Sequence, residues 1–298
     1  MSAPAHLNDT ALQALELSDN ERIQRIKSPR WIGYPTAIQL LNKMEDLLHY
    51  PPTHRMPNLL IVGESNNGKT MLLNRFCSLH PAEDNPNGDG IVAPVIYIES
   101  PPVPDEGRFY SEILDMLFAP YKTSSRADDK ERQVIRLLKS IGTRILIIDE
   151  IHHLLAGSMS KQKAFLNVIK HLGNRLQASI IASGTKDAFR AVQTDPQLSN
   201  RFKPALLPTW QFGTDFRRLL ISFERMIPLK NPSNLQEPGL AMKLHSMCEG
   251  NIGELSNLLI EAAVLAVKSG SECITDKELK AIGWASPSER KKVITRTR

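Results

Sequence analysis

The chain is poor in cysteine and lacks a long apolar segment. Three of its 298 residues are cysteines, Cys77, Cys248 and Cys273, and none of them forms a C-x-x-C pair. This scatter indicates neither a disulfide framework nor a cysteine metal site, and it fits a reducing compartment. No apolar run approaches the roughly 20 residues that span a bilayer, and Met1 to Asp9 has no signal-peptide pattern. We therefore expect a cytoplasmic protein without a membrane partner.

Composition and length leave the class of protein open. Hydrophobic residues make up 41% of the chain and charged residues 23%, which is ordinary for a soluble globular protein. The length suits one or two domains with a full core. A net charge of +5 is compatible with a polyanionic partner, but many soluble proteins are equally basic, so charge does not decide the matter.

One segment has a specific chemical signature. Residues 58–70 read NLLIVGESNNGKT, an apolar strand that runs into the pattern GxxxxGK[ST]. Gly63 and Gly68 let the loop turn its N–H groups inward, Lys69 supplies a charge for the β and γ phosphates, and Thr70 offers a hydroxyl to Mg²⁺. The alternative is a glycine-rich turn without a ligand. The predicted ATP ligands in this segment are Gly63, Glu64, Ser65, Asn66, Asn67, Gly68, Lys69, Thr70 and Met71.

An acid pair completes the expected site. Residues 144–150 read RILIIDE, and four consecutive apolar residues there predict a strand buried in a parallel sheet. At its carboxyl end, Asp149 can hold the Mg²⁺ shell and Glu150 can polarise the water that attacks the γ phosphate. Two acids that cap a following helix are the structural alternative. We therefore expect Lys69 and Glu150 to act in catalysis, and Thr70 and Asp149 to bind the metal.

Strands and helices are expected to alternate up to Pro208, which predicts an α/β fold with a parallel sheet. After Pro208 the pattern is helical only. The expected strands are 59–62, 95–98, 145–148, 179–182 and 205–207. The expected domains are an N-terminal arm over 1–30, an α/β nucleotide-binding domain over 31–212, a helical lid over 213–285 and a basic tail over 286–298.

A nucleotide-binding sheet followed by a small helical lid resembles the AAA+ P-loop NTPases. Residues 179–185, SIIASGT, match the sensor 1 segment of that class, so Ser183 or Thr185 would contact the attacking water or the γ phosphate. A plain turn with a helix cap at Thr185 is the alternative. Residues 198–202, LSNRF, match the arginine-finger segment, so Arg201 would act on a neighbouring subunit's nucleotide, unless it forms a surface salt bridge. At Gly253, many relatives have a sensor 2 arginine that this chain lacks.

Within that class the chain resembles the TniB-type transposition ATPases. The resemblance rests on SPRWIGYPTA (28–37), GESNNGKTM (63–71), IIDEIHH (147–153) and GNIGEL (250–255). It implies a homo-oligomer or filament that forms on double-stranded DNA in the ATP state, recruits a DDE transposase and sometimes a TniQ-like target selector, and is dispersed by hydrolysis. By the same analogy Tyr34 would pack near adenine, although a core role suits it nearly as well.

A basic stripe is the predicted DNA-binding face. Arg132, Arg136 and Lys139 fall at intervals of four and three in a helical segment, and Lys122 and Arg126 precede it. A solvated helix face is the alternative. No segment resembles a base-reading element, so DNA binding should be sequence-tolerant and steeply salt-dependent. Two rival functions share the nucleotide motifs: a replication helicase loader or initiator, and a scaffold that binds ATP without hydrolysing it.

Overall fold

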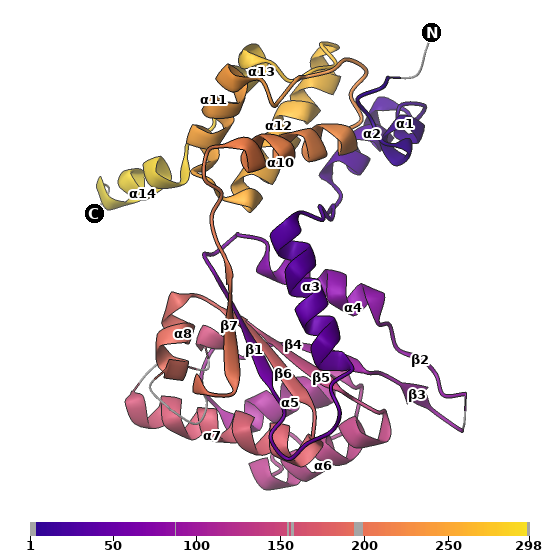
Figure 1. Cartoon of the computed structure of the whole chain (residues 1–298), viewed down its shortest axis with the longest axis vertical. Helices are drawn as coiled ribbons and strands as arrows, with labels where there is room; N and C mark the ends of the chain where they lie inside the picture. Colours follow the sequence, from indigo (N-terminus) through magenta and orange to yellow (C-terminus); the bar gives the residue numbers. More distant parts are fainter. Residues whose placement is uncertain (1–3, 87, 154, 156–157, 194–198, 297–298) are drawn as a thin grey trace. The chain divides into compact units, whose positions relative to one another are not determined.

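The computed structural model describes residues 4–86, 88–153, 155, 158–193 and 199–296, and contacts divide the chain into two compact units (Figure 1). One unit is Pro35–Pro208. The other joins Met1–Tyr34 to Thr209–Arg298. Each unit has its own cluster of buried apolar side chains.

The unit Pro35–Pro208 is an α/β domain. Its elements in chain order are α3 (Pro35–Leu48), β1 (Asn58–Gly63), α4 (Lys69–Leu79), β2 (Glu83–Asp84), β3 (Ile91–Val92), β4 (Val95–Glu99), α5 (Glu106–Met116), α6 (Ala127–Ser140), β5 (Ile145–Asp149), the 3₁₀ helix η1 (Ile151–His153), α7 (Met159–Leu176), β6 (Ser179–Gly184), α8 (Lys186–Gln193) and β7 (Phe202–Leu207).

Five parallel strands form the sheet in the order β4-β5-β6-β1-β7, which confirms the predicted α/β fold. Helices α3 and α4 cover one face, and α5, α6 and α7 cover the other (Figure 1). Every residue of β1, β5 and β6 is buried, as expected for strands covered on both faces. Alternate residues such as Leu60 and Val62 of β1 enter the core shared with α5, α6 and α7.

The second unit is helical and includes the N-terminal segment. Its elements are α1 (Asp9–Ala14), α2 (Asp19–Lys27), α10 (Thr214–Met226), α11 (Pro238–Cys248), α12 (Ile252–Ser269), α13 (Asp276–Ala281) and α14 (Pro287–Arg296). Within the described residues no single helix is long and apolar enough to cross a bilayer. Helices α11 and α12 together have enough length and apolar character, but the chain bends by 116° between them.

The N-terminal boundary differs from the one expected from the sequence. Residues 1–30 were expected to be a separate arm, but α2 packs into the helical unit. Ile23 and Ile26 are buried in the same apolar cluster as Phe216, Leu220 and Leu258. The physical reason is that α2 is amphipathic, with an apolar side that is covered only when it packs against another element. Likewise, the expected basic tail contains helix α14.

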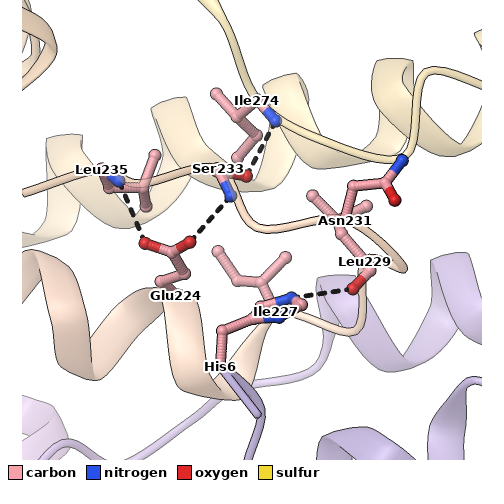
Figure 2. A pocket seen from close by; sticks show the side chains of 8 residues that line it. All are labelled: His6, Glu224, Ile227, Leu229, Asn231, Ser233, Leu235 and Ile274. Atoms are coloured by element: carbon pink, nitrogen blue, oxygen red, sulfur yellow. Dashed lines mark hydrogen bonds between the residues drawn. The ribbon is translucent and has the colours of Figure 1, made fainter. Parts of the chain in front are cut away.

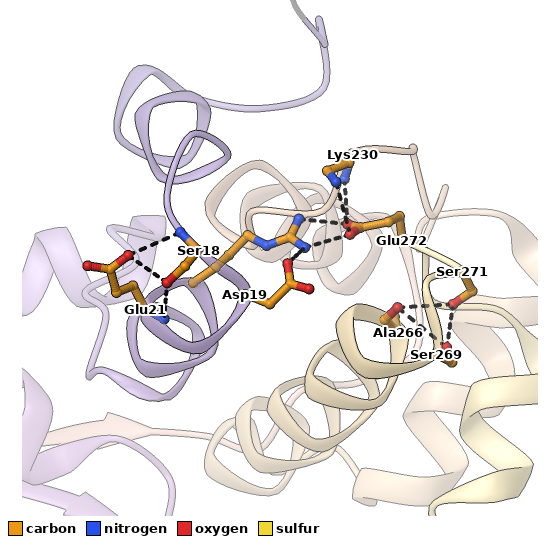
Figure 3. A network of polar contacts seen from close by, with 9 residues as sticks. Ser18, Asp19, Glu21, Lys230, Ala266, Ser269, Ser271 and Glu272 are labelled. Atoms are coloured by element: carbon orange, nitrogen blue, oxygen red, sulfur yellow. Dashed lines mark hydrogen bonds and ion pairs between the residues drawn. The ribbon is translucent and has the colours of Figure 1, made fainter.

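A buried ion pair joins the two ends of the helical unit. The Arg22 guanidinium of α2 donates to Glu272 Oε2 at 2.8 Å and to Glu272 Oε1, and also to Asp19 Oδ1 at 2.8 Å, in the network shown in Figure 3. The backbone N–H of Lys230 donates to Glu272 Oε2 at 3.2 Å. Arg22 and Glu272 are both buried, so each charge needs compensation from the other, with further contributions from Asp19 to Arg22 and from Lys230 Nζ, 3.6 Å from Glu272 Oε1.

We expect Arg22→Ala to destabilise the helical unit by about 3–5 kcal/mol, because it leaves the buried Glu272 carboxylate without its main partner. The three tryptophans, Trp31, Trp210 and Trp284, all belong to this unit, so their fluorescence during urea unfolding reports on it. The matched control is Arg25→Ala, an exposed position on the same helix, which should change stability by less than about 0.5 kcal/mol. Equal stabilities of the two variants would contradict a structural role for the ion pair.

A second buried carboxylate fixes the connection between α10 and α11. Glu224 accepts hydrogen bonds from the backbone N–H groups of Ser233 at 2.7 Å and of Leu235 at 3.0 Å (Figure 2). His6 Nε2 lies 3.2 Å from the Leu229 carbonyl oxygen beside it. These contacts give the N–H groups of a turn their partners, and they attach the N-terminal segment to that turn.

Candidate active site

The phosphate loop has the expected strand–loop–helix context. β1 is buried along its whole length, and α4 begins at Lys69 immediately after Gly68. Gly68 has a φ of 83°, a left-handed conformation that a residue without Cβ adopts easily. Asn66 has a φ of 59°, and asparagine tolerates this region better than most residues. The turn directs the first N–H groups of α4 toward the carboxyl end of β1, where an anion would bind.

Lys69 lies across this loop. Its Nζ donates to the carbonyl oxygens of Glu64 at 2.9 Å and Gly63 at 3.2 Å, and the residue is buried. These contacts hold the ammonium group over the loop, where a β or γ phosphate could take over from the carbonyl oxygens as its partner.

Asp149 is the centre of a hydrogen-bond network. Its Oδ2 accepts from Thr70 Oγ1 at 2.7 Å and from the Tyr97 hydroxyl at 3.0 Å. Its Oδ1 accepts from the Glu150 N–H at 2.9 Å and from Ser183 Oγ. β5 lies between β4 and β6, so Tyr97 of β4 and Ser183 of β6 reach the same carboxylate. Burial and the Asp149 charge raise the pKa of Tyr97, which keeps its hydroxyl protonated and able to donate.

The oxygen atoms of Thr70 and Asp149 suit Mg²⁺. Hard oxygen ligands are what this ion prefers, and it commonly takes one or two protein oxygens together with phosphates and waters. Within the described part of the chain, no group of three or more His, Cys, Asp or Glu side chains is placed to hold a metal alone. The Thr70 and Asp149 oxygens fit the Mg²⁺ of a metal–nucleotide complex, in which phosphates and waters supply the other ligands.

Glu150 follows in an unusual backbone conformation. Its φ of 52° is uncommon for a residue with a side chain, and it occurs where β5 turns into η1. The Glu150 carboxylate lies 3.0 Å from His152 Nδ1, although the two atoms lack hydrogen-bond geometry. Burial lowers the pKa of His152, and the charge of Glu150 opposes this shift.

Two contacts at the site had no clear signal in the sequence. Asn67 is buried, and its Nδ2 donates to the carbonyl oxygens of Leu207 at 2.7 Å and Pro208 at 3.1 Å, which anchors the phosphate loop to the end of β7. Asn67 was predicted as an ATP ligand but not as this anchor, and Tyr97 was not among the predicted site residues. A polar aromatic residue in the strand next to the acid pair was the available clue, but strand order was needed to interpret it.

Arg201 and the phosphate loop lie at opposite ends of the strands. Arg201 is at the end of the sheet where β1 and β7 begin, and the phosphate loop is at the end where they finish. β1 and β7 are parallel, with Asn58 paired to Phe202 and Gly63 paired to Leu207. Arg201 therefore stands where β1 begins, and its carbonyl oxygen accepts from the Asn58 N–H at 2.9 Å. The six residues of β1 separate these two ends of the sheet by about 20 Å. Arg201 Nη1 donates to Asn174 Oδ1 at 2.8 Å, and Leu198 of the same motif lies outside the described residues.

The predicted DNA-binding stripe is exposed. Val134, Ile135 and Leu138 of α6 are buried, whereas Arg132, Arg136 and Lys139 face solvent, as do Lys122 and Arg126. Two acids reduce its net positive charge, because Asp129 pairs with Arg132 and Asp128 lies 4.0 Å from Arg126. Exposed pairs of this kind contribute little energy, so a phosphate backbone can displace them.

The segment at residues 250–255 acts in the helical unit as a capping turn. Gly250 has a φ of 70°, and a Cβ there would stand 2.2 Å from the Trp210 carbonyl oxygen. Asn251 caps α12 by accepting from the N–H of Gly253 at 3.0 Å. Tyr34, the predicted adenine contact, packs edge-on against Trp210 with ring centroids 4.9 Å apart, and burial raises its pKa to about 12. It belongs to the helical unit.

A five-stranded parallel sheet, a phosphate loop after β1, an acid pair at the end of β5 and C-terminal helices together define an AAA+ ATPase fold. CDC6P of Pyrobaculum aerophilum is similar, with a TM-score of 0.63 and 15% identity over 88% of this chain and 69% of that one. The Aeropyrum pernix ORC1 protein in complex with DNA gives 0.61 and 16% over 91% and 69%. The chain belongs to the TniB family, because a family profile described as Bacterial TniB protein matches residues 22–212.

Curated relatives match more locally. The chaperone protein ClpB of Aquifex aeolicus (strain VF5) is 25% identical over 152 residues, which are 50% of this chain and 14% of ClpB. The chain spans less than a fifth of the curated relatives it matches, at 14% and 19% of their lengths.

Proposed function

We propose that this chain is a Mg²⁺-dependent ATPase of DNA transposition that assembles on duplex DNA when ATP is bound. The TniB family supports the transposition role, since it comprises transposition-associated AAA+ proteins. The assembled form marks a target site and recruits a DDE transposase, in some systems with a TniQ-like selector. Hydrolysis then disperses it.

The observation that carries the proposal is the placement of Arg201 about 20 Å from the phosphate loop of its own chain. Arg201 is too far away to act on its own nucleotide. A complete active site therefore requires the phosphate loop of one copy and Arg201 of the next copy. A head-to-tail contact of this kind generates rings or helical filaments. Filaments are the form that suits a protein coating a double helix.

In each copy the residues of the α/β unit divide the chemistry. The loop N–H groups and Lys69 hold the β and γ phosphates. Thr70 and Asp149 would hold Mg²⁺, which would supply positive charge against the negative charge of the β and γ phosphates. Glu150 orients the attacking water and accepts its proton, while Ser183 holds Asp149 in place.

For DNA binding we expect the double variant Arg132→Ala and Arg136→Ala to bind more weakly and with a shallower salt dependence. Loss of two phosphate contacts should lower the slope of log K against log salt by about 2. The charge-matched control is Lys161→Ala with Lys163→Ala, two exposed positions on α7. Fluorescence anisotropy with a labelled duplex across a salt series measures the slope. An unchanged slope would return the stripe to a solvated helix face.

The proposed function is tested by measuring ATP turnover with and without duplex DNA, and by capturing partners on the assembled protein. We expect DNA to stimulate turnover and a DDE transposase to bind the ATP-state assembly. ATP binding without turnover would instead indicate a scaffold that ATP only locks. Binding to a replicative helicase rather than a transposase would indicate a loader.

A further inference from the structure

A positively charged cavity lies at the end of the sheet where strands β1 and β7 begin. It has a volume of about 390 Å³, and its lining includes Tyr50, Arg55, Met56, Arg201 and Lys203. This volume falls within the range of small-molecule sites, roughly 300–1,000 Å³. Arg55 comes from the loop before β1, and Lys203 is the second residue of β7. Three cationic side chains from two segments far apart in sequence therefore surround one hollow.

The charges of this cavity are not compensated within the described structure. None of the described residues that line it carries a carboxylate, and none of Arg55, Arg201 and Lys203 has an ion pair there. Burial, and then the nearby charge of Arg55, lower the pKa of Arg201. Like charges held together without a counter-ion repel one another, and an anion that enters relieves this repulsion. The cavity is therefore suited to a compact, multiply charged anion.

The chain's own nucleotide cannot supply that anion. Its phosphate loop begins at Gly63, at the other end of β1, about 20 Å away. Duplex DNA is a poorer match than a nucleotide, because its phosphates are spread along an extended backbone, whereas these three cations surround a single concavity. A terminal phosphate presented by another molecule matches both the charge and the size.

We propose that Arg55 and Lys203 join Arg201 in a three-cation site that receives the γ phosphate of ATP bound to a second copy of this chain. This inference rests on the proposed function. In the copy that holds ATP, a bond forms between water oxygen and γ-phosphorus while the bond from γ-phosphorus to the bridging oxygen breaks. Glu150 takes the water proton, and ADP leaves with the bridging oxygen. Arg55 and Arg201 stabilise the charge on the equatorial oxygens in that transition state.

The test is Arg55→Ala in the full chain with MgATP and duplex DNA. We expect kcat to fall about 10²-fold, as when one charge-stabilising donor is removed from a transition state. Binding of a fluorescent ATP analogue to dilute protein should be unchanged, because the variant keeps its own phosphate loop. Arg55→Lys should restore part of the rate. The control Arg175→Ala removes an exposed arginine that is outside the lining and should leave kcat unaltered.

A mixing experiment shows whether Arg55 acts between copies. The Arg55→Ala variant keeps Glu150 but has an incomplete three-cation site. The Glu150→Gln variant keeps the three-cation site but lacks the base. Random head-to-tail pairing in an equal mixture makes about a quarter of the interfaces complete, so turnover should recover to about a quarter of the wild-type rate. A mixture no faster than the mean of its components would overturn the inference.

Other outcomes separate this inference from the proposed function. Wild-type turnover of Arg55→Ala together with weaker DNA binding would assign the cavity to a DNA phosphate and overturn the inference alone. Absence of turnover by the wild-type protein at every concentration, with DNA present, would refute the proposed function and this inference together.

Discussion

Arg201→Ala should lower kcat for ATP hydrolysis by about 10³–10⁵-fold while leaving ATP affinity in dilute protein unchanged. That range is typical of an arginine supplied to a neighbour's phosphoryl-transfer site. The physical reason is the direction of β1 and β7. Because these strands are parallel, Arg201 lies at the end of the sheet opposite the phosphate loop. We therefore expect loss of its charge to affect the transition state in another copy and not the nucleotide pocket of its own chain.

Steady-state turnover as a function of protein concentration measures this effect. Wild-type turnover per chain should rise with concentration as copies assemble, and the variant should stay low throughout. Arg175→Ala, an exposed position near the same end of the sheet, controls for loss of charge. A rate per chain that does not depend on concentration, with Arg201→Ala at the same value, would contradict action between copies.

Glu150→Gln should lower turnover by about 10²–10⁴-fold, the usual contribution of a general base. Glutamine keeps the shape of the side chain and tolerates the φ of 52° as well as glutamate does, but its amide cannot accept the water proton. ATP and DNA binding should persist, because Lys69, Thr70 and Asp149 are untouched. The variant should therefore remain assembled on DNA in the presence of ATP.

The control for this variant is Glu99→Gln. Glu99 is exposed and is paired with Asp149 in the register of β4 and β5. The Glu99→Gln substitution therefore removes a similar charge at the same end of the strands. Single-turnover measurements with saturating MgATP distinguish slow chemistry from slow product release. If Glu150→Gln and Glu99→Gln hydrolysed ATP equally fast, Glu150 would not be the base.

The strands were predictable where apolar runs were uninterrupted. β1, β4, β5 and β6 were each expected within two residues of their observed ends. β7 was expected over 205–207 but spans Phe202–Leu207, because Pro204 weakens the strand pattern. Proline is tolerated there since β7 is at the edge of the sheet, where one side of the backbone needs no partner.

Local sequence was sufficient to predict the loop between β1 and α4 and the acid pair at the end of β5, because the residues that make each of them are neighbours in the chain and their backbone geometry is set by nearby glycines and apolar runs. The packing of α2 with the C-terminal helices joins Arg22 to a residue 250 positions away. The anchoring of Asn67 crosses 140 positions, and the separation of Arg201 from Lys69 depends on the order and direction of the strands. Contacts of that range form only when whole elements pack and their loops close, and no short pattern encodes the outcome.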